Sequence, residues 1–312
     1  MRNSLYKVLS GMPLGALHCK RPVLHKFTFL EHVAPFTVIV PAHNEAAHIA
    51  QTLVFMGAGD EAGADGALPA GCQIIVACNG CADDTAAVAR RTATRAQVLD
   101  LAERGKALAI NRALALASHP VVLVVDADVL ISAASLGALA AALGQQGVLA
   151  ASPTAQFAMA GASWLVRAYY RCFASHPYLR SGVGGAGVYG LSAEGLAQVA
   201  PLPLVIADDH YVRCALPLAS QRRLGADAAV AVVAPPRDLA ALLGTEGRSR
   251  RGDRQVHQRL PASREGAGRW LLGAALRQPV AAAVFVAVKL LARARLLVPH
   301  RDARDGWATL RG

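Results

Sequence analysis

The sequence predicts an α/β fold, with a mostly parallel sheet flanked by helices and a basic, helical C-terminal extension. Short runs of β-branched and apolar residues alternate with segments of helical periodicity, and this order favours parallel strands joined by right-handed crossovers. The 54% hydrophobic content comes mostly from Ala, Val and Leu, whereas aromatic residues make up only 5%. Such a composition suits helices and buried parallel strands better than an aromatic-rich sandwich.

The first half of the chain alternates strands with helices. The run FTVIVP at 36–41 predicts a strand, and 43–56 is expected to be a helix because Ile49, Leu53 and Val54 recur near helical spacing. The Gly/Ala/Asp-rich stretch 57–71 predicts a loop. The same reasoning predicts strands at 73–78, 97–101 and 121–125, and helices at 83–95 and 106–118.

The second half has a looser pattern. It predicts helices near 136–143, 164–173 and 210–218, a mixed segment at 150–157, and a Gly-rich stretch at 182–190. In parallel sheets ligands bind at the carboxyl ends of the strands. Chemistry is therefore expected at 41–45, 78–84 and 126–128.

Positive charge is concentrated at the C-terminal end. The formal net charge is +11, and residues 244–312 hold 14 Lys and Arg against 5 Asp and Glu. Such a block fits an anionic partner, such as a membrane surface, a lipid diphosphate or a nucleotide, although a solvated surface is the plainer alternative. Nucleic acid fits poorly, because only Trp270 and Trp307 are interleaved as aromatic stacking partners.

The most apolar segment is 279–298. Lys289, Arg293 and Arg295 interrupt it before the roughly 20 apolar residues that a membrane span requires. The segment therefore predicts an amphipathic helix that lies on a membrane surface or packs on the domain.

The six cysteines form no disulfide framework, which suits a reducing cytoplasm. Cys78 and Cys81 form a CxxC pair, but no second Cys/His pair follows at the spacing of a zinc site, which favours reduced thiols. The N-terminus lacks the pattern of a signal peptide. We therefore expect a cytoplasmic protein.

An Asp-x-Asp triplet follows the most apolar strand. Asp126 and Asp128 are two residues apart, and in an extended chain such residues project to the same side. Two carboxylates there can hold Mg²⁺ or Mn²⁺, whose other positions go to water and diphosphate oxygens. The triplet alone is weak, since most such pairs are turn or cap carboxylates. Its place after VVLVV strengthens the prediction, because a buried strand has no packing reason to end in two carboxylates.

Two further sites carry charge at the ends of elements. Asp208 and Asp209 close an apolar run, and Asp209 is our candidate for the base that accepts a proton from a hydroxyl nucleophile. The alternative is a helix N-cap at either aspartate. Lys106 begins a helix, where a phosphate contact is natural, and an ordinary exposed lysine is the alternative.

These pieces occur in the order seen in the family-2 glycosyltransferases, which have the nucleotide-sugar-binding GT-A fold. The resemblance runs from about 36 to 254. The matching stretches are VIVPAHNEAAHI at 38–49, IIVACNGCADDTAAVA at 74–89, RGKALAINRAL at 104–114, VVDADV at 124–129, GGAGVYGLSAEGL at 184–196 and ADDHYVR at 207–213.

The resemblance implies a GT-A type, Rossmann-like sheet and three parts of the chain. These are an N-terminal extension at 1–35, a catalytic domain at 36–240, and a basic, amphipathic extension at 241–312. The catalytic domain would consist of a nucleotide-sugar-binding half, 36–130, and an acceptor half, 131–240.

It also implies roles for individual residues. Asp128 would bind Mg²⁺ or Mn²⁺ together with Asp126, which would also face the ribose or the sugar, and Asp209, next to Asp208, would be the base of one inverting displacement. Gly185 and Gly187 would lie on the acceptor side. The donor would contact Pro41, Ala42, Asn44, Glu45, Asn79, Asp84 and Lys106, with Arg251 or Arg254 on the diphosphate.

Departures from the family narrow the expectation. Cys78 and Asn79 stand where many relatives have an acidic residue, and the late Gln-x-x-Arg-Trp element of processive synthases is not evident in RSRRGDRQ at 248–255. We therefore expect single addition to a saccharide or lipid-linked acceptor in envelope polysaccharide or glycolipid synthesis. The enzyme would be peripheral at the inner face of the membrane.

Two other classes of protein are considered. Gly182, Gly184 and Gly187 match the dinucleotide fingerprint of nicotinamide oxidoreductases, but they lie deep in the second half of the chain rather than after a first strand. His43 and His48 are five apart, so HNEAAH is not a zinc helix. A non-catalytic, anion-binding protein at the membrane would use the basic tail alone, and the set of Lys106 and the aspartates argues against it.

Overall fold

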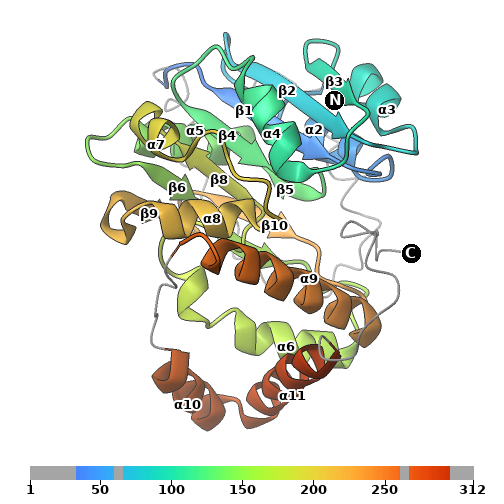
Figure 1. Ribbon diagram of the computed structural model, residues 1–312, viewed down its shortest axis with the longest axis vertical. Coiled ribbons are helices and arrows are strands. Elements are labelled where there is room, and N and C mark those ends of the chain that lie inside the picture. Colours follow the sequence, from blue (N-terminus) through green and yellow to red (C-terminus); the bar gives the residue numbers. More distant parts are fainter. Residues whose placement is uncertain (1–32, 60–65, 261–266, 296–312) are drawn as a thin grey trace.

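A computed structural model describes residues 33–59, 66–260 and 267–295 (Figure 1). Residues 1–32 of the predicted N-terminal extension and residues 60–65 of the predicted loop 57–71 lie outside the described residues. So do residues 261–266 and 296–312 of the predicted C-terminal extension. The main sheet has seven strands in the order β3-β2-β1-β4-β8-β6-β9. Its strands are β1 (Thr37–Ala42), β2 (Gln73–Asn79), β3 (Gln97–Leu101), β4 (Val122–Val125), β6 (Ala150–Ser152), β8 (Val188–Leu191) and β9 (Gln221–Arg223).

Strands β3, β2, β1 and β4 pair with one another in parallel. Strand β8 is antiparallel to both of its neighbours, β4 and β6. The predicted mostly parallel α/β sheet is therefore confirmed. A second sheet has the order β5-β10-β7, from β5 (Val129–Ile131), β10 (Val230–Val233) and β7 (Thr154–Phe157). It begins directly after the Asp126–Asp128 turn, so that turn lies where the chain leaves one sheet for the other.

Helices cover both faces of the main sheet. Consecutive residues of β1 point to opposite faces: Val38 and Val40 pack in one apolar cluster and Ile39 in another. This explains why the strand is an unbroken apolar run instead of an alternating one. The flanking helices are α2 (Ile49–Phe55), α3 (Thr85–Thr92), α4 (Lys106–Leu114), α5 (Ala133–Leu143), α7 (Ala193–Val199) and α8 (Asp208–Ala215).

A third apolar cluster lies at the lower end of the molecule in Figure 1. It is built from α6 (Trp164–Phe173), α9 (Leu239–His257), α10 (Ala267–Arg277) and α11 (Pro279–Arg295). Phe285 of α11 stacks on Tyr169 of α6 with ring centroids 5.0 Å apart. Of the two alternatives for 279–298, the docked helix is therefore what the structure shows for residues 279–295. Within residues 33–59, 66–260 and 267–295, no helix is long and apolar enough to span a membrane.

Several predicted helix boundaries were wrong. The helix expected at 43–56 begins only at Ile49, because residues 43–48 form a turn in which Asn44 has a φ of 54°. The left-handed conformation cannot continue a right-handed helix. Helix α8 begins at Asp208 with Ala207 as its N-cap, so the two aspartates lie in the first turn and the N-cap alternative is wrong.

The predicted boundary at 240 falls inside α9, which starts at Leu239. Asp238 caps this helix by accepting a hydrogen bond from the Ala241 N–H at 2.9 Å. The segment 241–257 is thus part of a helix that begins before the predicted boundary. Figure 1 shows α9 running beside α8 under the main sheet.

Candidate active site

A cavity of about 540 Å³ opens at the carboxyl ends of β1 and β4. Parallel strands bring their carboxyl ends to one edge of a sheet, and in this sheet that edge is the expected ligand site. The first turns of α4 and α8 and one face of α9 complete the wall. The lining residues are Pro41, His43, Asn44, Glu45, Ala47, His48, Asp83, Lys106, Asp126, Ala127, Asp128, Gly187, Tyr189, Ile206, Ala207, Asp208, Asp209, Pro236, Thr245, Arg248 and Ser249.

The Asp-x-Asp turn joins β4 to β5 and faces this cavity. The Asp126 N–H donates to the Gly187 carbonyl at 2.8 Å, which continues the antiparallel pairing of β4 with β8 by one residue. Gly187 has a φ of 63°, and a Cβ there would lie 2.6 Å from Val129 Cγ2 and 3.2 Å from Asp126 Oδ2. A glycine is therefore needed for the chain to pass this close to the two carboxylates.

Lys106 lies between two carboxylates at the floor of the cavity. Its Nζ is 2.7 Å from Asp126 Oδ1 and 2.9 Å from Asp208 Oδ1. Burial works against the charged ammonium, but the carboxylates of Asp126, Asp208 and Asp209 outweigh it and raise the pKa of Lys106. The ammonium is consequently a fixed positive charge that holds α4 against the end of β4 and the start of α8.

Burial raises the pKa of Asp126 above its ordinary value. The Lys106 charge opposes this shift, whereas the Asp208 and Asp128 charges add to it. Burial and the neighbouring carboxylates together therefore outweigh the effect of Lys106 on the pKa of Asp126. Additional positive charge would favour the ionised form of Asp126.

The two aspartates of α8 have different surroundings. Asp208 is 1% exposed and accepts a hydrogen bond from the Tyr189 hydroxyl at 3.0 Å in addition to its ion pair with Lys106. Asp209 is partly exposed in the same cavity, and its Oδ2 accepts the Gly185 N–H at 3.1 Å. Asp208 is thus a buried structural charge, whereas Asp209 is a carboxylate that a ligand can reach.

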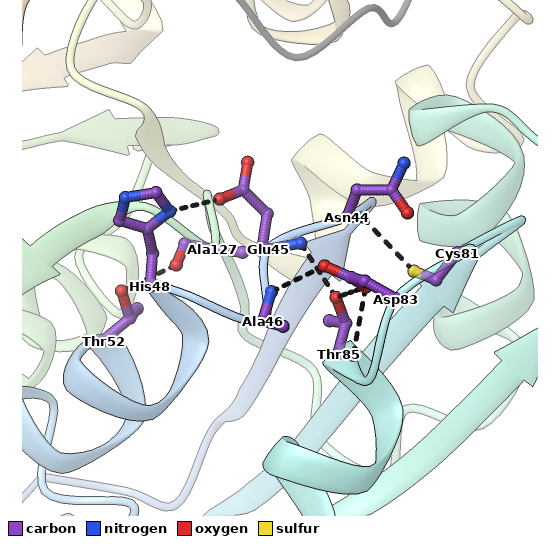
Figure 2. A network of polar contacts seen from close by, with 9 residues as sticks. All are labelled: Asn44, Glu45, Ala46, His48, Thr52, Cys81, Asp83, Thr85 and Ala127. Carbon is purple, nitrogen blue, oxygen red and sulfur yellow. Dashed lines mark hydrogen bonds and ion pairs between the residues drawn. The ribbon is translucent and has the colours of Figure 1, made fainter. Parts of the chain in front are cut away.

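The loops that follow β1 and β2 are hydrogen-bonded to each other (Figure 2). The Asn44 Oδ1 accepts the Ala82 N–H at 2.7 Å, the Glu45 N–H donates to Thr85 Oγ1 at 2.8 Å, and the Ala46 N–H donates to Asp83 Oδ2 at 3.1 Å. These bonds hold Asn44 in its left-handed conformation, which Asn tolerates better than most residues. They also direct the Glu45 side chain into the cavity, where it pairs with His48 at 2.9 Å.

Most of the predicted site residues line this one cavity, and six do not. Ala42 is 1% exposed and Asn79 is 0% exposed. Asn79 is instead a structural link, because its Nδ2 donates to the Ala42 carbonyl at 2.8 Å and its Oδ1 accepts the Gly105 N–H at 3.1 Å. Asp84 is exposed outside the cavity, and its neighbour Asp83 occupies the position expected of it.

The arginine prediction was also wrong in position. Thr245, Arg248 and Ser249 line the cavity, and their spacing of three and four residues marks one face of α9. Arg251 and Arg254 are exposed and do not line the cavity. Recognising 239–257 as a single helix would have identified Arg248 from the sequence. Gly185 does not line the cavity either, and contributes through its N–H to Asp209.

Carboxylates outnumber cationic side chains among the lining residues. Glu45, Asp83, Asp126, Asp128, Asp208 and Asp209 face only Lys106 and Arg248, besides the imidazoles of His43 and His48. A diphosphate would be repelled by such a wall unless a divalent cation accompanied it. The paired oxygen donors of Asp126 and Asp128 fit a hard cation such as Mg²⁺ or Mn²⁺.

The glycines at 182, 184 and 187 do not form a dinucleotide site. They precede β8, an antiparallel strand, whereas the fingerprint must follow the first strand of a βαβ unit and open a helix. All three have positive φ values, and the loop they form supports Asp126 and Asp209.

Comparison with known proteins finds a related family. Residues 37–181 match the family described as Glycosyl transferase family 2. This part of the chain is therefore similar to glycosyl transferase family 2. The match begins at β1 and includes the Asn44 turn, Lys106 and the Asp126–Asp128 turn, while α8 and α9 lie beyond it. No curated protein matches the chain in sequence.

Solved structures are similar to this chain. The mannosyltransferase PcManGT from Pyrobaculum calidifontis, in complex with GDP-Man and Mn²⁺, is 23% identical; the similarity covers 85% of this chain and 81% of that one, with a TM-score of 0.53. Glucosyl-3-phosphoglycerate synthase from Mycobacterium tuberculosis is 21% identical over 74% and 82% of the two chains, with a TM-score of 0.47. The similarity to PcManGT shows that the fold is the GT-A fold.

Proposed function

We propose that the chain transfers a sugar from a nucleotide-diphosphate donor to an acceptor hydroxyl, with inversion, in the cavity that contains Asp126, Asp128 and Asp209. The observation that carries the proposal is that the Asp126–Asp128 pair and Asp209, which is far from the pair in the sequence, line one cavity at the carboxyl end of the sheet. The PcManGT complex with GDP-Man and Mn²⁺ supports the same class of donor and cation.

Asp128 and Asp126 would hold Mg²⁺ or Mn²⁺. When bound, this cation would neutralise the charge that develops on the departing diphosphate. Lys106 keeps Asp126 and Asp208 in place through its two ion pairs. Arg248, which lines the same cavity, would contact the diphosphate itself.

Asp209 would act as the general base. Its carboxylate takes the proton of the acceptor hydroxyl while the acceptor oxygen forms a bond to the anomeric carbon and the bond from that carbon to the diphosphate oxygen breaks. One displacement of this kind inverts the anomeric centre. Two backbone groups fix the orientation of the Asp209 carboxylate: its Oδ2 accepts the Gly185 N–H, and its Oδ1 accepts the His210 N–H in the first turn of α8.

The donor side and the metal can be tested without knowing the acceptor. Mn²⁺ together with UDP, GDP or dTDP should raise the melting temperature of the wild-type protein, by an amount that corresponds to about 2.7 kcal/mol when the ligand is at one hundred times its Kd. Asp128→Ala should lose the Mn²⁺-dependent part of this shift. Asp227→Ala, which changes an exposed aspartate in the turn before β10, is the matched control.

Two results would contradict the proposal. One is a nucleotide shift that is the same with and without Mn²⁺ in the wild-type protein, and the other is an Asp128→Ala protein that keeps the full shift. A nucleotide-sugar donor should also be hydrolysed slowly in the presence of Mn²⁺, which a non-catalytic anion-binding protein would not do.

We further propose that the enzyme adds single sugars to a saccharide or lipid-linked acceptor while bound to the inner face of the cytoplasmic membrane. Helices α10 and α11 expose an apolar row, with Leu272 67%, Leu276 80% and Val280 67% exposed, and Arg269 and Arg277 lie on the same helices. Exposed apolar residues beside cationic ones are typical of helices that bind an anionic membrane surface.

Sedimentation with vesicles tests this part separately. The wild-type protein should bind vesicles rich in phosphatidylserine at low salt, and Leu272→Ser with Leu276→Ser should reduce binding. Leu204→Ser is the control, because Leu204 is equally exposed, at 68%, but lies before α8. Absence of binding by the wild-type protein would refute the membrane proposal and leave the transferase proposal intact.

A further inference from the structure

A second group of metal-ligating side chains lies between α8 and α9, outside the cavity. His210 and Cys214 are one turn apart on α8, and Asp253 and His257 are one turn apart on α9. Figure 1 shows the two helices side by side. None of the four residues lines the cavity described above.

The ligand atoms of three of these residues converge. One atom each of His210, Cys214 and His257 lies within 4.8 Å of the others. Cys214 Sγ is 3.6 Å from His210 Nε2, and the rings of His210 and His257 are nearly perpendicular, at 88°, with centroids 5.2 Å apart. Asp253 Oδ1 is 3.9 Å from the same Nε2 of His210.

These distances suit a tetrahedral metal site. Zinc is bound at about 2.0–2.1 Å by imidazole nitrogen and at about 2.3 Å by thiolate sulfur, so neighbouring ligand atoms are about 3.3–3.8 Å apart. The 3.6 Å and 3.9 Å separations are already close to that range. The ligand atoms of His210, Cys214 and His257 all lie within 4.8 Å of one another, so a shift of at most about 1 Å would bring them to these distances.

A hydrogen-bonded cluster is the alternative explanation. A hydrogen bond accounts for His210 with Cys214, and an ion pair accounts for His210 with Asp253. Asp253 interacts electrostatically with both histidines, and this accounts for the positions of the two rings. It does not account for the Cys214 thiol, which lies within 4.8 Å of the ligand atoms of both His210 and His257. A shared metal ion accounts for all of them together.

We propose that His210, Cys214 and His257 bind one Zn²⁺, with Asp253 within reach of the fourth position. Two imidazoles and a thiolate select Zn²⁺ over Mg²⁺ or Mn²⁺, which prefer oxygen ligands, so this site and the Asp126–Asp128 site would take different metals. On binding, the Cys214 thiol gives its proton to the solvent and the thiolate becomes a ligand.

The site would fix one helix relative to the other. Helix α8 carries Asp208 and Asp209 in its first turn, and α9 carries Arg248 on the opposite wall of the cavity. A metal held from both helices would stabilise the folded state by binding it and not the unfolded chain. The proposal concerns metal binding and does not depend on the transferase proposal.

Cobalt substitution tests the site directly. The full-length protein, treated with EDTA and returned to metal-free buffer, should bind Co²⁺ and show a thiolate-to-cobalt charge-transfer band and intense visible bands of tetrahedral Co²⁺. Stoichiometric Zn²⁺ should abolish both. The variants are Cys214→Ser and His257→Ala, and the second is well suited because an exposed side chain can be removed without loss of the fold.

Controls separate this site from other thiols and from the cavity. Cys72→Ser and His119→Ala change a cysteine and a histidine far from α8 and α9, and both should keep the charge-transfer band. Asp128→Ala should keep it as well, because it alters only the site in the cavity. Circular dichroism spectra that match the wild type would show that each variant is folded.

The expected result is a band that is lost in Cys214→Ser, and a Zn²⁺ affinity at least about tenfold weaker in His257→Ala, since loss of even an outer-shell partner costs about 10- to 100-fold. The proposal is overturned if the wild-type protein gives no thiolate-to-cobalt band. It is equally overturned if the band persists in a folded Cys214→Ser protein, or if His257→Ala binds Zn²⁺ as tightly as the wild type.

Discussion

The ammonium group of Lys106 lies 2.9 Å from the carboxylate of Asp208, and this contact joins the first turn of α4 to the first turn of α8. Asp208 is 1% exposed, so its charge is compensated by Lys106 and by the Tyr189 hydroxyl and not by water. The pair thereby fixes the position of the next residue, Asp209, in the cavity wall. The part of the chain that precedes β5 and the part that follows it are connected at this point.

Lys106→Met should destabilise the protein strongly. Removing one partner of a buried ion pair leaves an uncompensated charge and costs about 3–5 kcal/mol. Urea unfolding should show this loss in the free energy of unfolding. In the double variant Lys106→Met with Asp208→Asn, part of the loss should be recovered, because the buried negative charge is removed as well. A loss under about 1 kcal/mol for Lys106→Met would be inconsistent with a buried pair.

Asp209→Asn should abolish transfer while leaving nucleotide affinity nearly unchanged. The base acts on the acceptor, and its removal lowers the rate by about 100- to 10,000-fold. Initial rates and a nucleotide titration on the same preparation would measure both quantities. Asp227→Asn is the exposed control and should be fully active. An equal loss of nucleotide binding would reassign Asp209 to the donor side.

Gly187→Ala should destabilise the Asp126–Asp128 turn. The new Cβ would lie 2.6 Å from Val129 Cγ2 in a backbone conformation with φ 63°, so both overpacking and strain contribute, at about 1–3 kcal/mol each. Gly147→Ala is the matched control, since Gly147 has φ 78° but open space around its Cβ. Urea unfolding should show a larger loss for Gly187→Ala, and equal losses would show that the collision with Val129 contributes nothing.

Cys81 should react faster than Cys72 at neutral pH. A hydrogen bond from the Cys78 thiol stabilises the thiolate and holds the pKa of Cys81 below its ordinary value, although burial opposes the shift. Burial raises the pKa of Cys72. Because the thiolate is the nucleophile, alkylation of Cys81 should reach its plateau at a lower pH than alkylation of Cys72.

Peptide mapping after iodoacetamide treatment across a pH series would measure this order. Cys78→Ala removes the donor and should move the Cys81 midpoint upward, towards that of an ordinary thiol. If Cys81 and Cys72 were alkylated with the same pH dependence in the wild-type protein, the hydrogen bond between Cys78 and Cys81 would have no effect on reactivity.

Local pattern was sufficient for much of the fold. The apolar runs at 73–78, 97–101 and 121–125 became strands, and 164–173 became a helix with the predicted bounds, because each has one dominant periodicity. The first helix was misplaced because the conformation of Asn44 depends on hydrogen bonds from the loop after β2, which the local sequence cannot reveal. Asn79 was misplaced for a similar reason, since its amide is used between loops and not on a ligand.

The sequence by itself determined the alternation of strands and helices, and with it the edge of the sheet at which Asp126 and Asp128 lie. It also showed the resemblance to family-2 glycosyltransferases, through motifs that are local in the chain. Only the tertiary structure decided which charges compensate one another, that Arg248 and not Arg251 or Arg254 faces the cavity, and that His210 and Cys214 meet His257. Those relationships depend on the packing of α8 and α9, and packing between segments distant in the chain leaves no periodic trace in the sequence.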